Sequence, residues 1–477
     1  MSYMGKAARR IKPLHTFREA GTPPFAVQLR VGIAARKTDR TGKKTFMPLD
    51  TLIDRRAFFA HAALSSGFVA TSLALPAGVL AHDVGSSFPR LTALVDRYLS
   101  ERKVANLLVT LGNGQEDHMH TVGGGKLAFR SDSEADENSI YRIYSMTKPV
   151  TGIATMMLIE DGAFGLDTPL ADILPAFADM RVLTRANGPL NETVAAERAI
   201  TIRHLLTHTA GLSYIIEAKG PLRRAFVERG LTGGRVTRLP IPGLSGGPDA
   251  PSLEVMADRL AQLPLIAQPG AKWAYSASFD LLGRVIEVAS GMPFDRFLET
   301  RIFAPLGMTS TGFTVKRGDR ARLTDNYGVL NGTPIPIDPA GASILLDEPS
   351  FPAGGGGLVS TPKDYDRFMR MLLGYGTLDG TQVMEEATVR TAVSNLLPEG
   401  ATTAGTWVAG QGFGAGGRVT NGSFGWGGAA GTLASVEFGL NKRVGLYTQY
   451  MPPETYPLRE EFIAALMADL GVMREAA

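Results

Sequence analysis

The most informative segment of this chain reads Tyr144-Ser145-Met146-Thr147-Lys148-Pro149. The apolar residues after it recur at helical spacing and end before Gly162, so we expect a helix that opens at Ser145. A spacing of three residues would place Ser145 and Lys148 on one face, one turn apart. Pro149 is compatible with this position, because proline is tolerated in the first turn of a helix.

Serine and lysine in this geometry suit nucleophilic catalysis. A serine hydroxyl is a weak nucleophile until a neighbouring base takes its proton. Lysine becomes such a base once its ammonium has lost a proton, and burial and the positive end of a helix both favour that loss. Taken alone, the pattern is equally typical of a serine that caps a helix beside a solvated lysine.

Two later segments supply candidate partners. The first reads Gln268-Pro269-Gly270-Ala271-Lys272-Trp273-Ala274-Tyr275-Ser276-Ala277 and precedes an apolar-periodic helix, which puts Tyr275 on a turn where a phenol can relay protons. The second reads Phe424-Gly425-Trp426-Gly427-Gly428-Ala429-Ala430-Gly431-Thr432 and enters an expected strand. A backbone N–H there can complete an oxyanion hole with the N–H of Ser145. A core tyrosine and a tight turn are the structural alternatives.

Periodicity along the rest of the body predicts strands at both ends and helices between them. The expected elements are a helix over 89–101, strands over 106–111, 120–129, 432–438 and 444–450, and a last helix over 458–470. This order implies an α/β (α+β) domain over 82–477. Its sheet region covers about 82–144 and 352–477, and a mainly helical region over about 145–351 is inserted.

The N-terminal segment differs from the body in charge. Residues 1–81 hold 13 basic and 4 acidic residues, whereas the rest holds 36 and 42. We interpret 1–53 as a basic extension that is either disordered or not translated, since Met47 begins a more conventional signal. Residues 54–81 combine Arg55 and Arg56 with an apolar run and a small-residue exit, which predicts a twin-arginine signal and a periplasmic or secreted protein. A membrane anchor and a buried helix are the alternatives, although the polar residues in the run disfavour a stable membrane span.

Composition excludes several classes of function. The 477 residues include no Cys, which rules out disulfides, thiolate metal sites and a cysteine nucleophile. The acidic body gives no reason to expect a nucleic acid partner. No metal or other cofactor is predicted.

Some motifs are misleading. Gly243-Leu244-Ser245-Gly246-Gly247 matches the nucleophile elbow G-x-S-x-G, but prolines flank it and favour a loop over the required strand and helix. His204 and His208 have the i, i+4 spacing of a zinc pair, but the Glu of H-E-x-x-H is missing.

Together, in this order and spacing, the three segments resemble the serine β-lactamase and penicillin-binding-protein superfamily over roughly 90–470. Supporting segments are Ile200–Ser213, Phe294–Met308 and Gly354–Thr361. The resemblance implies an antiparallel sheet flanked by the terminal helices, with a helical region beside it. It also implies Ser145 as the acylated nucleophile, Lys148 and Tyr275 as the general-base pair, and the N–H groups of Ser145 and Ala429 as the oxyanion hole.

Two positions depart from the class C β-lactamase pattern. Those enzymes carry Tyr-x-Asn and Lys-Thr-Gly, whereas this chain has Ala277 in place of the Asn and Trp426 in place of the Lys. The sequence Trp426-Gly427-Gly428 resembles the family VIII carboxylesterases instead. The resemblance therefore implies a small ester as substrate, bound beside Trp426, Gly427, Gly428 and Ala277. The alternatives are a β-lactamase, D-amino-acid peptidase or acyltransferase of the same fold, or an inactive relative that binds peptidoglycan or another ligand. The sequence does not indicate the oligomeric state.

Overall fold

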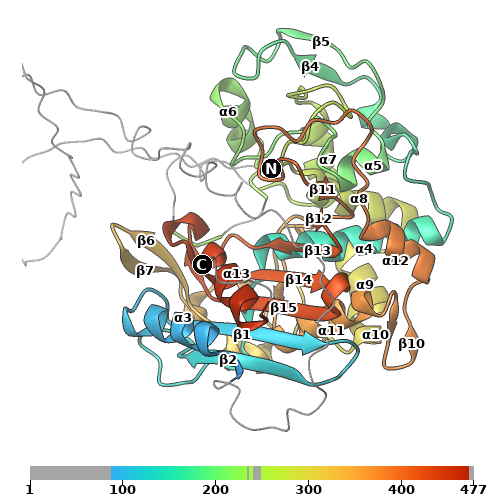
Figure 1. Cartoon of the computed structure of the whole chain (residues 1–477). Helices are drawn as coiled ribbons and strands as arrows, with labels where there is room; N and C mark the ends of the chain where they lie inside the picture. Colours follow the sequence, from blue (N-terminus) through green and yellow to red (C-terminus); the bar gives the residue numbers. More distant parts are fainter. Residues whose placement is uncertain (1–86, 234–235, 240–248, 472–477) are drawn as a thin grey trace, which may run out of the picture. The chain divides into compact units, whose positions relative to one another are not determined.

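The computed structural model describes residues 87–233, 236–239 and 249–471, which all belong to the unit Arg56–Ala477. The basic extension, the twin-arginine segment and Ser245 lie outside the described residues. The body is built on a seven-stranded antiparallel sheet in the order β11-β12-β13-β14-β15-β1-β2 (Figure 1). Its strands are β1 (Asn106–Asn113), β2 (Met119–Gly125), β11 (Gly412–Phe413), β12 (Arg418–Thr420), β13 (Ser423–Gly427), β14 (Leu433–Glu437) and β15 (Lys442–Tyr447).

The centre of the sheet joins the two ends of the body. Strand β1 pairs with β15, with Leu108 opposite Tyr447. Successive side chains of a strand point to opposite faces, and here both faces are covered: Leu107 belongs to one hydrophobic cluster and Leu108 to the other. This explains why β1 reads as a continuous apolar run and not as an alternating one.

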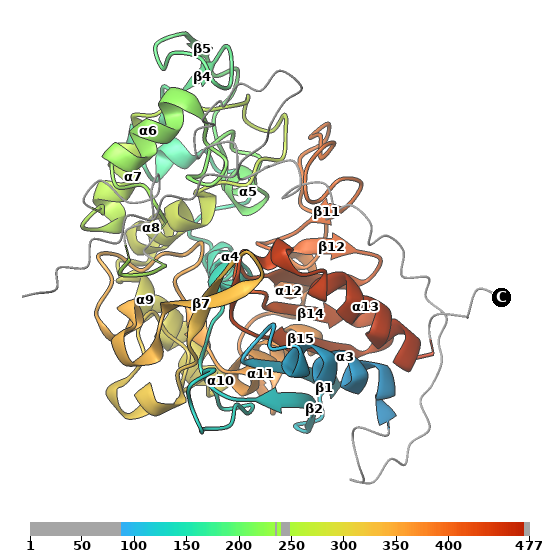
Figure 2. The ribbon, with the colours of Figure 1, turned by 90° about the vertical axis from the view of Figure 1, so that its left-hand side faces the viewer.

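Two terminal helices cover one face of the sheet. Helices α3 (Pro89–Ser100) and α13 (Leu458–Asp469) lie against each other and against this face (Figures 1 and 2). The Tyr98 hydroxyl of α3 donates to the Glu461 carboxylate of α13 at 2.6 Å. Both helices were predicted from their apolar spacing. The predicted α+β fold, with its antiparallel sheet, terminal helices and inserted helices, is confirmed.

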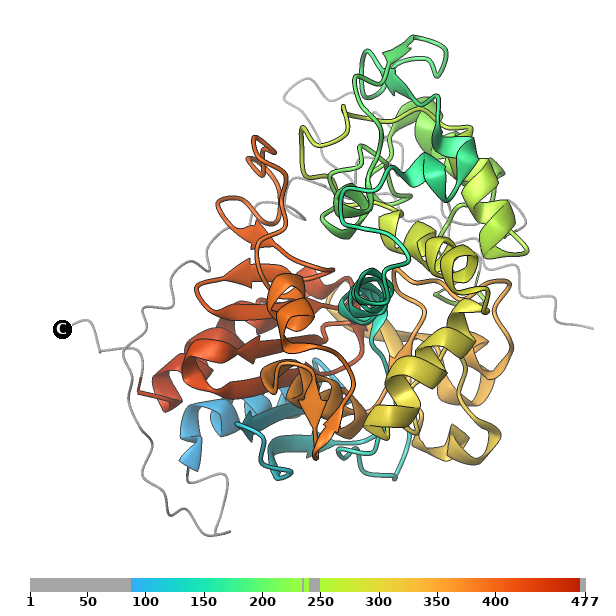
Figure 3. The ribbon, with the colours of Figure 1, turned by 90° about the vertical axis from the view of Figure 1, so that its right-hand side faces the viewer.

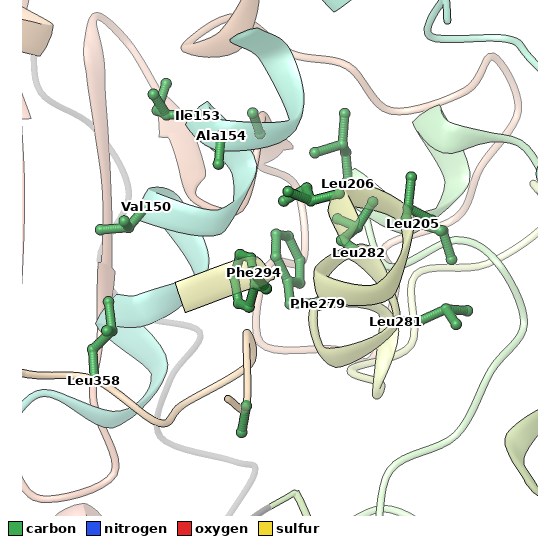
Figure 4. Packing of buried hydrophobic residues seen from close by; sticks show 14 of the residues in the cluster. Val150, Ile153, Ala154, Leu205, Leu206, Phe279, Leu281, Leu282, Phe294 and Leu358 are labelled. Carbon is green, nitrogen blue, oxygen red and sulfur yellow. The ribbon is translucent and has the colours of Figure 1, made fainter. Parts of the chain in front are cut away.

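The main core lies on the opposite face. Helix α4 (Thr147–Glu160) runs between β13 and α8 (Ser278–Ser290), and α11 (Pro362–Leu373) covers β14 and β15 (Figure 3). In the core, Val150 and Ile153 of α4 belong to one hydrophobic cluster with Phe279 of α8 and Phe294 (Figure 4). Burying side chains of this size stabilises the fold by roughly 1.5–3 kcal/mol each. This packing also brings the start of α4 next to the start of α8.

Smaller elements complete the body. The other helices are α5 (Ile202–Leu206), α6 (Gly220–Glu228), α7 (Leu253–Ala261), α9 (Phe294–Leu298), α10 (Ala304–Leu306) and α12 (Glu386–Ala392). The small sheets pair β3 (Tyr141–Arg142) with β8 (Val359–Ser360), β4 (Arg181–Leu183) with β5 (Thr193–Ala195), β9 (Thr377–Leu378) with β10 (Thr381–Gln382), and β6 (Asn326–Leu330) with both β7 (Thr333–Asp338) and β16 (Tyr450–Met451). Within the described ranges, no helix is long and apolar enough to cross a membrane.

The structure differs from the sequence prediction at two strands. Strand β2 ends at Gly125 and not at residue 129, because the chain turns just beyond it, where the Ser131 N–H donates to the Ala128 carbonyl at 3.0 Å. The segment expected only to enter a strand contributes a strand of its own, β13, which ends at Gly427. Glycines at alternate positions of β13 hid this strand, since glycine is depleted in strands.

One buried histidine caps helix α5. The Thr201 hydroxyl accepts the His204 N–H, and His204 Nδ1 accepts the Thr201 N–H at 3.1 Å, which forms a capping box. Burial, and then the charge of Arg198, lower the pKa of His204 to about 4. His204 therefore stays neutral in the folded protein at pH values where an unfolded histidine binds a proton.

We expect this histidine to make the protein less stable in acid. The pKa of His204 is lower in the folded than in the unfolded protein. The stabilisation that comes from neutral His204 is therefore complete above pH ~6.5, and it is lost at about 1.4 kcal/mol per pH unit as the pH falls toward 4. Urea unfolding at a series of pH values should show that the free energy of unfolding depends less steeply on pH in His204→Gln than in the wild type. The amide oxygen of Gln can still accept the Thr201 N–H. Replacing the exposed His118 by Gln is the matched control. An equal pH dependence of the unfolding free energy in His204→Gln and the wild type would contradict this role of His204.

Candidate active site

Ser145 lies on a strained turn between β3 and α4. A single 3₁₀ turn, Tyr144–Met146, connects them, and Tyr144 has a positive φ of 42°. Non-glycine residues adopt this region at a cost, which surrounding contacts have to offset. The side chain of Asn326 donates to the Tyr144 hydroxyl at 3.0 Å. The turn leaves Ser145 half-buried just before the first residue of helix α4.

Three predicted residues meet at the Ser145 hydroxyl. The Tyr275 hydroxyl is 2.6 Å from Ser145 Oγ, and Lys148 Nζ donates to the same oxygen at 3.2 Å. Lys148 is fully buried, and only 4% of Tyr275 is exposed. Tyr275 arrives from the turn before α8, 130 residues away in sequence. One oxygen is thus in contact with two groups that can exchange protons.

The amine of Lys148 is held by a glycine-rich segment that follows β7. Lys148 Nζ donates to the Gly355 carbonyl at 2.5 Å, and the Gly355 N–H donates to Asp280 Oδ1 at 2.8 Å. A Cβ added at Gly354 would lie 2.4 Å from the Phe279 carbonyl oxygen, so this segment can touch α8 only without a side chain. The close approach of this segment to α8 therefore holds the Gly355 carbonyl against Lys148.

Asp280 was not identified from the sequence. It occupies the first turn of α8 and is 2% exposed. Burial raises the pKa of Asp280, whereas Lys148 and the Gly355 N–H lower it. A carboxylate in a helix's first turn is common, because it favours the positive end of the helix. That ordinary explanation concealed a side chain that belongs to the support of Lys148.

His208 lies behind Tyr275. Its Nδ1 accepts the Ser276 N–H at 3.2 Å, and its ring lies 4.8 Å from the Tyr275 ring. Burial, and then the charge of Lys148, hold the pKa of His208 well below its usual range. His204 caps helix α5 and His208 packs behind Tyr275, so the two histidines make separate local contacts. Within the described part of the chain, no group of three or more His, Asp or Glu residues could hold a metal ion.

All three tryptophans of the protein surround Tyr275. Ring centroids lie 6.0 Å away for Trp273, 4.7 Å for Trp407 and 6.1 Å for Trp426. Trp426, predicted to line the substrate site, is only 8% exposed and packs with the other two in one aromatic cluster. The surroundings of Tyr275 are therefore apolar. Trp407 was not recognised from the sequence, because no motif marks it.

The third motif forms the turn between β13 and β14. A Cβ added at Gly428 would lie 2.3 Å from the Ile143 carbonyl oxygen, so the turn lies directly against the segment that leads to Ser145. The Gly428 N–H donates to the Thr432 carbonyl at 2.8 Å. Among the described residues, no backbone carbonyl accepts the Ala429 N–H.

Ala277 takes a different position from the other predicted substrate-binding residues. It is the N-cap of α8, is 6% exposed and belongs to the main hydrophobic core. Its N–H donates to the Ser213 carbonyl at 3.0 Å. It therefore offers no polar side-chain group, in agreement with the missing amide noted in the sequence.

Comparisons with known proteins identify the family. Residues 91–468 match the Beta-lactamase family. Protein Rv1367c of Mycobacterium tuberculosis is 38% identical over 262 residues, which make up 55% of this chain and 61% of that protein, so the match spans less than two thirds of its length. Esterase EstB of Burkholderia gladioli is 28% identical over 322 residues, or 63% of this chain and 74% of that enzyme.

A solved structure shows the same fold. EstCE1, described as a hydrolase with promiscuous acyltransferase activity, has a TM-score of 0.64 at 24% identity. The superposition covers 80% of this chain and 98% of EstCE1. With a family match over most of the described body, the chain belongs to the Beta-lactamase family.

Proposed function

We propose that this protein hydrolyses small carboxylic esters through an acyl-enzyme on Ser145. The observation that carries the proposal is the contact of Ser145 Oγ with both the Tyr275 hydroxyl at 2.6 Å and Lys148 Nζ at 3.2 Å. A nucleophile within hydrogen-bond reach of its base, with that base held by further contacts, is the arrangement that activates serine.

In the first half of the reaction, Ser145 Oγ attacks the ester carbonyl carbon and its proton passes to the Lys148–Tyr275 pair. Negative charge develops on the carbonyl oxygen, which receives hydrogen bonds from the Ser145 and Ala429 N–H groups. The ester C–O bond then breaks, and the alcohol leaves with the proton held by the pair. The acyl group remains on Ser145.

In the second half, water replaces the alcohol. The pair takes a proton from the water as the oxygen attacks the acyl carbon, and the proton returns to Ser145 Oγ as the acid leaves. An alcohol in place of water would yield a new ester. Acyl transfer is therefore the second candidate function, and the EstCE1 description, which names both activities, favours keeping it.

The substrate class follows from what the site lacks. A β-lactam brings an amide and a carboxylate, and both need polar partners. Ala277 is a buried methyl group and Trp426 belongs to an aromatic cluster, so neither position supplies an amide or a cation. A simple ester needs neither contact, and the aromatic surroundings suit its acyl or alkyl chain. EstB, whose name describes an esterase, supports this choice.

Replacement of the catalytic residues should separate this mechanism from the nucleophile elbow. We expect Ser145→Ala to abolish ester hydrolysis, and Lys148→Met and Tyr275→Phe each to lower kcat by roughly 100-fold or more, because the three act as one unit. Ser245→Ala is the matched control and should keep most of the activity. Steady-state kinetics with a 4-nitrophenyl ester, with thermal melting to verify folding, checks this. Loss of activity in Ser245→Ala alone would move the nucleophile to the other motif.

Substrate preference should follow the missing polar contacts. Each absent contact is typically worth about 1.5–3 kcal/mol, so two lower kcat/KM for β-lactams by roughly 10²–10⁴-fold. We expect short-chain esters to be cleaved far faster than a chromogenic cephalosporin, and added alcohol to divert part of the acyl group into a new ester. A cephalosporin that exceeds every ester in kcat/KM would rule out the esterase proposal. Gain of β-lactam hydrolysis in Ala277→Asn with Trp426→Lys would support its explanation.

We also propose export of the body through the twin-arginine route. The support is Arg55 and Arg56 before the apolar run in the sequence. In a bacterial host, fractionation should recover esterase activity outside the cytoplasm, and replacing both arginines by lysines should retain the protein inside. Equal distribution of the two forms would contradict export by this route.

A further inference from the structure

The third motif is held from behind by the C-terminal helix. Arg459, in the first turn of α13, extends its side chain to the turn between β13 and β14. Its Nη2 donates to the Gly428 carbonyl at 2.5 Å and to the Thr432 carbonyl at 3.2 Å. These two carbonyls stand at the two ends of the turn. One guanidinium therefore fixes the width of the turn that carries Ala429.

The helix dipole does not explain the position of Arg459. A cation in the first turn of a helix lies at the positive end of the helix dipole. Arg459 forms no ion pair with any other described residue, although its charge lowers the pKa of Glu454, which burial raises. Burial and the charge of Arg459 also lower the pKa of Arg418 to about 10. Arg459 therefore lies near the basic Arg418 and near the acidic Glu454 and Glu460.

The glycine at 427 makes room for this cation. A Cβ added there would lie 2.9 Å from Arg459 Nη2 and 3.0 Å from its Cζ. Gly428 in turn lies against the backbone of Ile143. The two glycines of the motif therefore have different tasks: one admits the guanidinium, and the other brings the turn to the Ser145 segment.

The peptide group between Gly428 and Ala429 connects the cation to the reaction. Its carbonyl accepts from Arg459, and its N–H is the oxyanion donor that the proposed function assigns to Ala429. A charge-assisted hydrogen bond to a carbonyl polarises the whole peptide group, and hydrogen bonds in a chain strengthen one another. The N–H on the other side of the same peptide becomes a stronger donor.

We propose that Arg459 is a positioning residue that orients and polarises the Gly428–Ala429 peptide, and so strengthens the oxyanion hole. The inference rests on the proposed acyl-enzyme mechanism. Because the oxyanion exists only during the reaction, Arg459 should stabilise the transition state and not the bound ester. It makes this contribution without touching the substrate.

The test compares Arg459→Gln and Arg459→Lys with the wild type. Removing a direct oxyanion donor costs roughly 10²–10³-fold in kcat, so loss of a group that acts through the donor should cost about 10-fold or more. We expect Arg459→Gln to lower kcat by that factor and to weaken a boronic acid inhibitor equally, since its tetrahedral adduct occupies the oxyanion hole. KM for a neutral ester should change less than about 3-fold. Arg459→Lys, which keeps the charge, should recover part of both losses.

The matched control is Arg97→Gln. It removes the ion pair of α3 with Glu461 of α13, at 3.0 Å, and leaves the turn untouched. Its kcat and boronate affinity should equal those of the wild type. If Arg459→Gln fails to fold, Arg459→Lys decides the question. A decrease in kcat that is matched by an equal decrease in boronate affinity supports the proposal. Unchanged values in a folded Arg459→Gln, or loss of kcat without loss of boronate affinity, would overturn it.

Two other results have separate meanings. A large rise in KM confined to esters that carry an anionic group would show that Arg459 contacts the substrate directly, which overturns the positioning role. Full activity of Ser145→Ala would overturn the acyl-enzyme mechanism itself. The failure of the positioning role is therefore distinguishable from that of the proposed function.

Discussion

The arrangement around Ser145 depends on how the protein accommodates a fully buried lysine amine. Burying such a group without partners would cost several kcal/mol. Lys148 meets this requirement with the Gly355 carbonyl and Ser145 Oγ, and with the Tyr275 ring at 4.5 Å. Each partner comes from a different segment of the chain. The packing that satisfies the lysine is therefore the packing that assembles the site.

The same requirement explains the glycine-rich segment and Asp280. The Gly355 peptide can face Lys148 only if its N–H also has a partner, and Asp280 provides one at 2.8 Å. A buried N–H without an acceptor would be about as costly as the lost hydrogen bond. The buried carboxylate thus acts on Lys148 through one peptide group. Arg459 acts in the same way through the Gly428–Ala429 peptide, on the other side of Ser145. There the charged group is a cation, and it binds the carbonyl of the peptide instead of its N–H.

The sequence predicted the parts of the fold that local patterns encode. The terminal helices follow from apolar spacing, and Ser145 and Lys148 are one turn apart, so one helix is enough to bring them together. Tyr275 depended on resemblance, because its distance from Ser145 is set by the packing of α4 against α8. Trp407, Asp280 and Arg459 carry no local signal. Their roles arise from contacts across tens to hundreds of residues, which periodicity cannot reveal.

Two cationic side chains of the candidate site are placed in a way that suits acyl transfer chemistry. Lys148 lies on one side of Ser145, and Arg459 donates to the turn of the third motif. Asp280 is the carboxylate near Lys148, and it is turned toward the Gly355 N–H. A neutral ester gains little from such a field, whereas the tetrahedral oxyanion gains much in surroundings of low polarity. The aromatic cluster around Tyr275 reduces access of water, which would otherwise screen these charges. A cation held behind a backbone N–H group, as Arg459 is, therefore favours the transition state over the substrate.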